Sequence, residues 1–149
     1  SAAGNYIYYV AEGTTKNNVL CVGPRIAFKI NVYALPVVSH DIDDFYVCVG
    51  SNKTLTVEAA NAITVEWQYY NAKTTGWVAI STNLFSGKLT PNGYHLDISA
   101  ASGELDNLKI RAKFTSAGAC NVYSKEVAVQ VRSCMIMTNP MIPAKFKKS

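Results

Sequence analysis

Four cysteines and two histidines are the residues whose spacing tests most directly for metal or redox chemistry. The cysteines are widely separated, at Cys21, Cys48, Cys120 and Cys134. No Cys-x-x-Cys pair occurs, and neither His40 nor His95 lies close to a cysteine. This spacing does not suit zinc, whereas disulfide bonds formed in an oxidising compartment account for such cysteines. We therefore expect an extracellular or cell-surface location.

A short acidic segment could supply oxygen ligands to a cation. Asp41, Asp43 and Asp44 fall within a polar stretch that follows Pro36. Carboxylates of this kind can bind calcium between two modules. The glycine and glutamate of a recognised calcium loop are missing, so we expect solvated carboxylates and assign neither a metal nor a cofactor.

Five further carboxylates form no recognisable catalytic arrangement. They are scattered along the chain at Glu58, Glu66, Asp97, Glu104 and Asp106. No GxSxG, HExxH or glycine-rich phosphate loop accompanies them. The sequence therefore predicts a protein that is not an enzyme.

Three aromatic residues suggest an alternative, carbohydrate-binding function. Tyr69, Tyr70 and Trp77 surround an expected turn, and exposed aromatic rings at a sheet edge can stack on sugar rings. Trp77 follows a glycine and precedes Val78 and Ile80, a pattern that favours packing inside the domain. Binding to surface glycans is thus the second hypothesis, behind a structural function.

Charge and hydropathy exclude several other classes of partner. The formal net charge is +4, and Lys145, Lys147 and Lys148 cluster near the C-terminus. Such a small basic excess does not predict nucleic-acid binding. No run of eighteen apolar residues exists to cross a membrane, and SAAGNYIYY at the start does not resemble a signal peptide.

The central structural element is the stretch Ile63–Ile80, which contains two β-rich runs joined by a turn. In the first run, Ile63, Val65 and Trp67 alternate with polar residues. A two-residue period is typical of a half-buried strand, so we expect the Trp67 side chain on the inner face.

A series of short strands follows from Phe45 to Arg132. About seven β-rich segments are separated by Gly, Asn, Pro and Ser, the pattern of an all-β, immunoglobulin-like sandwich. The expected core comprises Trp67, Leu96, Ile110 and Val129.

The rest of the chain divides around this sandwich. Residues 1–37 are expected to be strands of a second sheet, residues 38–44 a linker, residues 45–132 the sandwich and residues 133–149 an extended tail. Because a strand pair alone is marginally stable in water, residues 1–37 need further sheet.

Within this frame, Cys48 precedes one strand and Cys120 lies in a turn between the last two. A disulfide between Cys48 and Cys120 is the favoured prediction, and two free, buried thiols are the alternative. Cys134 could pair with Cys21 if the chain ends meet, pair with an absent segment, or stay free.

The segment from Cys48 to Val131 resembles the Ig-like modules of large surface and secreted proteins of Bacteroidota. The resemblance covers about 85 residues. It depends on Cys-x-Gly at Cys48, Trp-Gln at Trp67, Gly-Trp at Trp77, a Tyr-x-Leu-x-Ile strand at Tyr94, and a Gly-x-Cys turn ending at Cys120.

The resemblance implies a non-catalytic structural or adhesive module that acts as a spacer or filament element. Residues 5–36 resemble the closing half of a preceding module, which is either completed by its own missing half or used to complete a sheet in another subunit. The implied partners are neighbouring Ig-like modules or identical subunits. The strand LKIRAKF lacks the Tyr-x-Cys of many immunoglobulin domains, so antibody-type details do not carry over.

Overall fold

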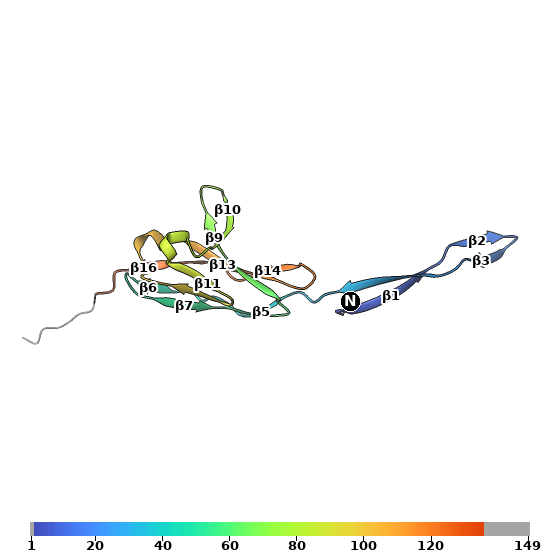
Figure 1. The fold of residues 1–149 in the computed structure, drawn as a ribbon, viewed down its shortest axis with the longest axis horizontal. Coiled ribbons are helices and arrows are strands. Elements are labelled where there is room, and N and C mark those ends of the chain that lie inside the picture. Colours follow the sequence, from blue (N-terminus) through green and yellow to red (C-terminus); the bar gives the residue numbers. More distant parts are fainter. Residues whose placement is uncertain (1, 136–149) are drawn as a thin grey trace, which may run out of the picture.

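A computed structural model describes residues 2–135, and these form two parts. A long two-stranded ribbon is formed by residues 4–32, and a β-sandwich follows it (Figure 1). The ribbon and the last strand of the sandwich lie at opposite ends of an elongated molecule. The expected tail of residues 133–149 falls mostly outside the described residues.

The ribbon is one long hairpin in two segments. β1 (Gly4–Val10) pairs antiparallel with β4 (Ile26–Val32), and β2 (Gly13–Lys16) pairs with β3 (Val19–Val22). Asn17 and Asn18, at the tip, have φ of 52° and 60°. Two consecutive residues with positive φ make the tight hairpin turn whose twist matches that of the flanking strands, and asparagine tolerates this conformation.

One sheet of the sandwich contains the strand that carries Trp67. Its strand order is β10-β9-β13-β14, and β15 also pairs with β13. The members are β9 (Thr64–Asn71), β10 (Gly76–Ala79), β13 (Lys109–Thr115), β14 (Asn121–Tyr123) and β15 (Val127–Ala128). All pairings in this sheet are antiparallel.

The facing layer is built from shorter strands. β11 (Leu89–Asn92), β12 (His95–Ile98) and β7 (Lys53–Thr56) pair in that order, and β5 (Val37–His40) pairs with β8 (Glu58–Ala60). Two 3₁₀ turns, η1 (Leu84–Gly87) and η2 (Gly103–Leu105), connect the layers.

The last strand of the sandwich runs parallel to β6 (Tyr46–Cys48), the strand that follows β5. β6 pairs with β16 (Gln130–Arg132), so that Val47 lies opposite Val131 and Cys48 lies opposite Arg132. Parallel neighbours need a long connection, and here almost the entire sandwich provides it. With this pairing the strands define an all-β, immunoglobulin-like sandwich.

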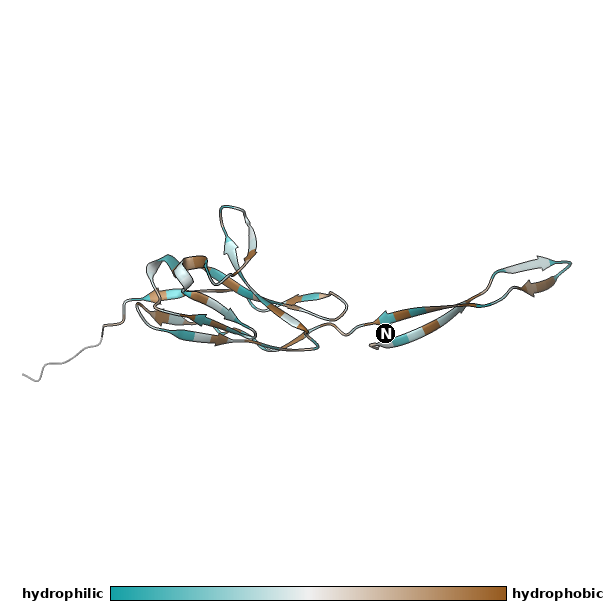
Figure 2. Cartoon of the chain, viewed as in Figure 1, coloured by the Kyte–Doolittle hydropathy of each residue, from teal (hydrophilic) through white to brown (hydrophobic). Residues whose placement is uncertain are grey.

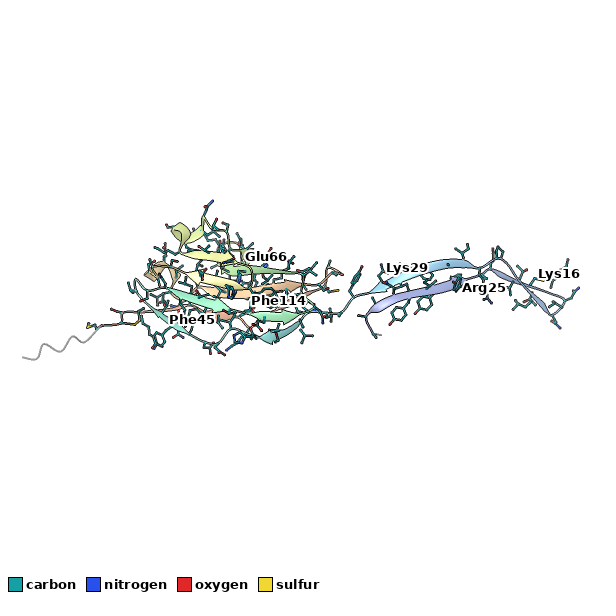
Figure 3. All side chains as sticks on the ribbon, turned by 60° about the horizontal axis from the view of Figure 1, so that its bottom comes forward. Lys16, Arg25, Lys29, Phe45, Glu66 and Phe114 are labelled. Carbon is teal, nitrogen blue, oxygen red and sulfur yellow. A yellow bond between two sulfur atoms is a disulfide. The ribbon has the colours of Figure 1, made fainter. Side chains whose placement is uncertain are left out.

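The core lies between the two sheets. Trp67, Leu96, Ile110 and Val129, the four side chains expected there, are all fully buried. The indole Nε1–H of Trp67 also donates a hydrogen bond to the Gly93 carbonyl over 3.1 Å. Figure 3 shows the labelled Phe114 between the layers, whereas the labelled side chains of the ribbon have no second layer beside them.

The expected linker at residues 38–44 is wrong. Residues 37–40 form strand β5 of the sandwich, Val38 packs against the core, and Ile42 is buried. Polar residues dominate the sequence of this segment, so the sequence pattern did not reveal that the side chains of Val38 and Ile42 point inward. The joint with the ribbon instead lies just before β5, where Pro36 is buried and the Tyr33 ring lies against Gly118.

Candidate functional site

The disulfide lies at the end of the sandwich farthest from the ribbon. Cys48 is bonded to Cys134, with the two Cα atoms 5.3 Å apart. The parallel pairing of β6 with β16 creates this contact, because Cys48 faces Arg132 and Cys134 follows two residues later. The Val49 N–H donates to the Arg132 carbonyl over 2.9 Å and extends the same contact.

The predicted Cys48–Cys120 bridge is therefore wrong. Cys120 precedes β14 in the turn after β13, and both Cys120 and Cys21 are free and exposed. A pairing of Cys21 with Cys134 is excluded for the same reason. The sequence shows the distance between cysteines along the chain, but it does not show that β6 and β16 pair in parallel.

The acidic segment fastens the start of the sandwich to the turn after β14. The Asp41 carboxylate accepts the backbone N–H of Lys125 over 2.9 and 3.1 Å and that of Ile42 over 2.8 Å. The ammonium of Lys125 also bonds the Asp44 carboxylate over 3.0 Å. These contacts occupy oxygen atoms that the calcium hypothesis would need. Within residues 2–135, no group of three or more Asp, Glu, His or Cys residues is arranged to hold a metal ion.

Four of the five carboxylates considered for catalysis have partners that are not carboxylates. Glu66 faces Lys113, Asp97 accepts from the Thr54 hydroxyl, and Asp106 accepts the Val131 N–H. Glu104 is bonded by the Lys88 ammonium, and this hydrogen bond is the main reason that the pKa of Glu104 lies below its ordinary value. These pairings stabilise connections between strands.

The most developed polar cluster lies on the outer face of the Trp67 sheet, and its centre is Arg111. The guanidinium carbon lies over two aromatic rings, 4.0 Å from the ring centroid of Trp77 and 4.0 Å from that of Tyr123. Its Nε–H donates to the Gln68 side chain over 3.0 Å, and Glu126 lies 3.6 Å away. We call these five residues the arginine stack.

The three aromatic residues considered for sugar binding do not form one platform. Tyr69 packs edge-on against Phe85, beside the core. Trp77 is half-buried, with Arg111 over its ring and Tyr70 against it edge-on at 5.7 Å. A sugar stacking on Trp77 from the side of Arg111 would have to displace the guanidinium. Sequence reasoning missed Arg111 and Tyr123, since alternation places them on the outer face but does not show their cross-strand neighbours.

Within residues 2–135, exposed large apolar side chains are concentrated on the ribbon. Tyr8 lies opposite Phe28 and Val10 opposite Ile26, and these four side chains remain 50% to 72% exposed. Figure 2 shows hydrophobic residues recurring along both strands of the ribbon.

Comparisons with known proteins agree with the fold. No family model matches the sequence, and no curated protein matches it. Among solved structures, Duf (Kirre) D1 superposes with a TM-score of 0.52 at 14% identity, covering 67% of this chain and 99% of that one. The titin domains Z1Z2 in complex with telethonin give 0.52 at 16% identity, covering 69% of this chain and 50% of theirs.

A third structure, Rst D1-D2, gives a TM-score of 0.51 at 15% identity and covers 64% of this chain. This chain spans about half the length of the Rst and titin chains. At these identities the likeness establishes the Ig-like fold, while function must be argued from the molecule itself. In the described part of the chain, no helix has the length and apolar character needed to cross a membrane.

Proposed function

We propose that this chain is a non-catalytic, Ig-like structural module that acts as a spacer or filament element in an extracellular or cell-surface protein of Bacteroidota. The observation that carries the proposal is the Cys48–Cys134 disulfide together with the parallel pairing that it flanks. The bacterial origin rests on the sequence resemblance. A disulfide just after the last strand, with Cys134 exposed and Cys48 half-buried, suits an oxidising compartment.

The position of the disulfide suits a module that carries tension along its length. The chain enters the sandwich at β5, near the ribbon, and leaves after Cys134 at the opposite end (Figure 1). A pulling force would pass from β5 through β6 to Cys48 and then directly across the disulfide to Cys134. The 86 residues of separation between these cysteines are thereby removed from the path of the force.

This proposal is tested by stretching single molecules held at residues 37 and 135. When it yields, the oxidised sandwich should lengthen by much less than the contour length of residues 37–48, about 40 Å, because only these residues can extend and the two handles already lie at opposite ends of the folded sandwich. After reduction, or in Cys134→Ser, the gain should rise by about 300 Å. Cys120→Ser is the matched control and should behave like the oxidised parent. An oxidised sandwich that extends fully would overturn the spacer proposal.

Carbohydrate binding is the weaker candidate, because Arg111 covers the Trp77 ring. Titration with soluble glycans, followed by Trp fluorescence, would reveal it. No response of the Trp77 signal to saturating glycan would eliminate this candidate.

A further inference from the structure

The β1–β4 part of the ribbon has one face without a polar side chain at its centre. Tyr6 and Ile30, Tyr8 and Phe28, and Val10 and Ile26 are directly opposed pairs, so all six side chains share that face. We call these six residues the apolar ribbon face. The opposite face is mixed, because it carries Asn5, Lys29 and Asn31 but also Ile7, Tyr9 and Ala27.

The closing strands of the sandwich repeat the pattern of the ribbon. Phe28, Ile30 and Val32 follow Cys21 by seven, nine and eleven residues, and the sandwich has apolar residues at the same three distances after Cys120. Those residues are Val127, Val129 and Val131. The cross-strand partners also correspond, because Tyr8 lies opposite Phe28 just as Ile110 lies opposite Val127.

The two hairpins differ in what covers them. Ile110, Val127 and Val129 are at most 2% exposed beneath the facing sheet. Strand β13 also pairs along its second edge with β9, and β16 pairs with β6. Within residues 2–135, β1 and β4 pair only with each other, so the ribbon has an uncovered apolar face and two unpaired edges.

We infer that the ribbon is the closing hairpin of a second Ig-like sandwich, and that the opening strands of that sandwich cover the apolar ribbon face. The closing hairpin consists of the last strands of such a fold, so the strands that cover it precede it in the parent polypeptide. The covering strands would supply an apolar inner layer and a strand that pairs with the free edge of β1. This inference rests partly on the proposed function, since it makes the chain part of a tandem array.

A second copy of this chain would cover the apolar ribbon face less well than the opening strands of a sandwich would. Each strand has seven residues, so the face measures about 23 Å by 10 Å, a footprint of roughly 230 Å². Stable interfaces bury about 800 Å² on each partner. Two ribbons packed face to face would fall well short of that area, and their edges would stay unpaired. An Ig-like half-sandwich covers the face and pairs the edges together.

Hydrogen exchange followed by mass spectrometry tests the inference. The 149-residue chain is compared with the same chain extended by about 70 preceding residues from its own reading frame, which corresponds to the length from β5 to η2 in the present sandwich. In the extended chain, amides of β1 and β4 should exchange roughly 100-fold more slowly, because they would join a cooperative unit. Unchanged exchange, or a preceding sequence without β-strand pattern, would overturn the inference.

Two substitutions in the extended chain sharpen the result. Phe28→Asp, on the apolar ribbon face, should abolish the new protection, and Lys29→Glu, on the opposite face, should preserve it. Peptides from residues 45–132 should stay protected in both, which shows that the present sandwich remains folded.

Protection of the ribbon in the 149-residue chain that rises with protein concentration would favour a second copy and contradict the inference. The stretching experiment on residues 37–135 does not involve the ribbon, so the two proposals can fail separately.

Discussion

The ribbon and the closing strands of the sandwich have similar apolar patterns but opposite surroundings. Phe28 is half exposed on β4, whereas Val127, at the same distance from its cysteine, is 2% exposed. The difference shows that alternation specifies a face suited to burial, and that a second layer must be present for the burial to occur. Stability in this chain should therefore be concentrated in the sandwich.

The largest expected contrast is between core and ribbon aromatics. Trp67→Ala should destabilise the sandwich by about 3–5 kcal/mol, since it removes a fully buried indole and leaves a cavity. Phe28→Ala in the 149-residue chain should change the free energy of unfolding by less than about 0.5 kcal/mol. Urea denaturation followed by circular dichroism measures both, and Trp67→Phe provides a milder variant that keeps the fold. Equal losses at positions 67 and 28 would mean that the ribbon is already covered.

The second contrast concerns the cysteines. Cys134→Ser opens the long loop closed by the disulfide and should cost about 2–4 kcal/mol. Cys21→Ser and Cys120→Ser, which alter exposed thiols in the ribbon and in a sandwich turn, should leave the thermal midpoint unchanged. Peptide mapping without reductant should recover Cys48 joined to Cys134. A fragment joining Cys48 to Cys120 would contradict the structure.

The sequence alone could predict part of the fold and core but not the disulfide. Local alternation was sufficient to place Trp67, Leu96, Ile110 and Val129 in the core, and the spacing of strands indicated the sandwich. The disulfide could not be predicted from the sequence, because it depends on pairing between strands more than eighty residues apart. The β5 strand could not be predicted for a different reason. Its apolar residues are next to polar and acidic residues, and some of these form hydrogen bonds at the edge of the domain.

For the arginine stack, the sequence predicts the face on which Arg111 lies but not the residues that contact it. Alternation along β13 assigns Arg111 to the outer face, opposite the face of Ile110 and Ala112. The identity of its neighbours depends on the register with β9, β10 and β14, and single-strand patterns do not contain that register.

The third contrast compares outward-facing cations in the two regions. Arg111→Ala should destabilise the sandwich by about 1–2 kcal/mol, because two ring contacts and the hydrogen bond to Gln68 are lost together. Lys29→Ala, on the outer face of the ribbon, should change stability by no more than about 0.5 kcal/mol. Urea denaturation monitored by Trp fluorescence measures both, since Trp77 reports on the stack directly. If Arg111→Lys retained full stability, charge alone would account for the effect and the planar stacking would be unimportant.

The smallest contrast depends on pH. The hydrogen bond from Lys88 lowers the pKa of Glu104 in the folded state, so this contact stabilises the sandwich fully above the unfolded-state pKa of about 4.3. As the pH falls through the lower, folded-state pKa, Glu104 is protonated and the contribution is lost. Glu104→Gln should therefore lower the urea midpoint slightly at pH 7 and match the parent once the pH has fallen below the folded-state pKa of Glu104. Glu12→Gln is the control, because Glu12 makes no ion pair within residues 2–135.

Since Glu104 lies at the surface, salt should weaken the effect of the Glu104→Gln substitution. A difference from the parent that persisted in high salt and acid would point to a contact other than the ion pair.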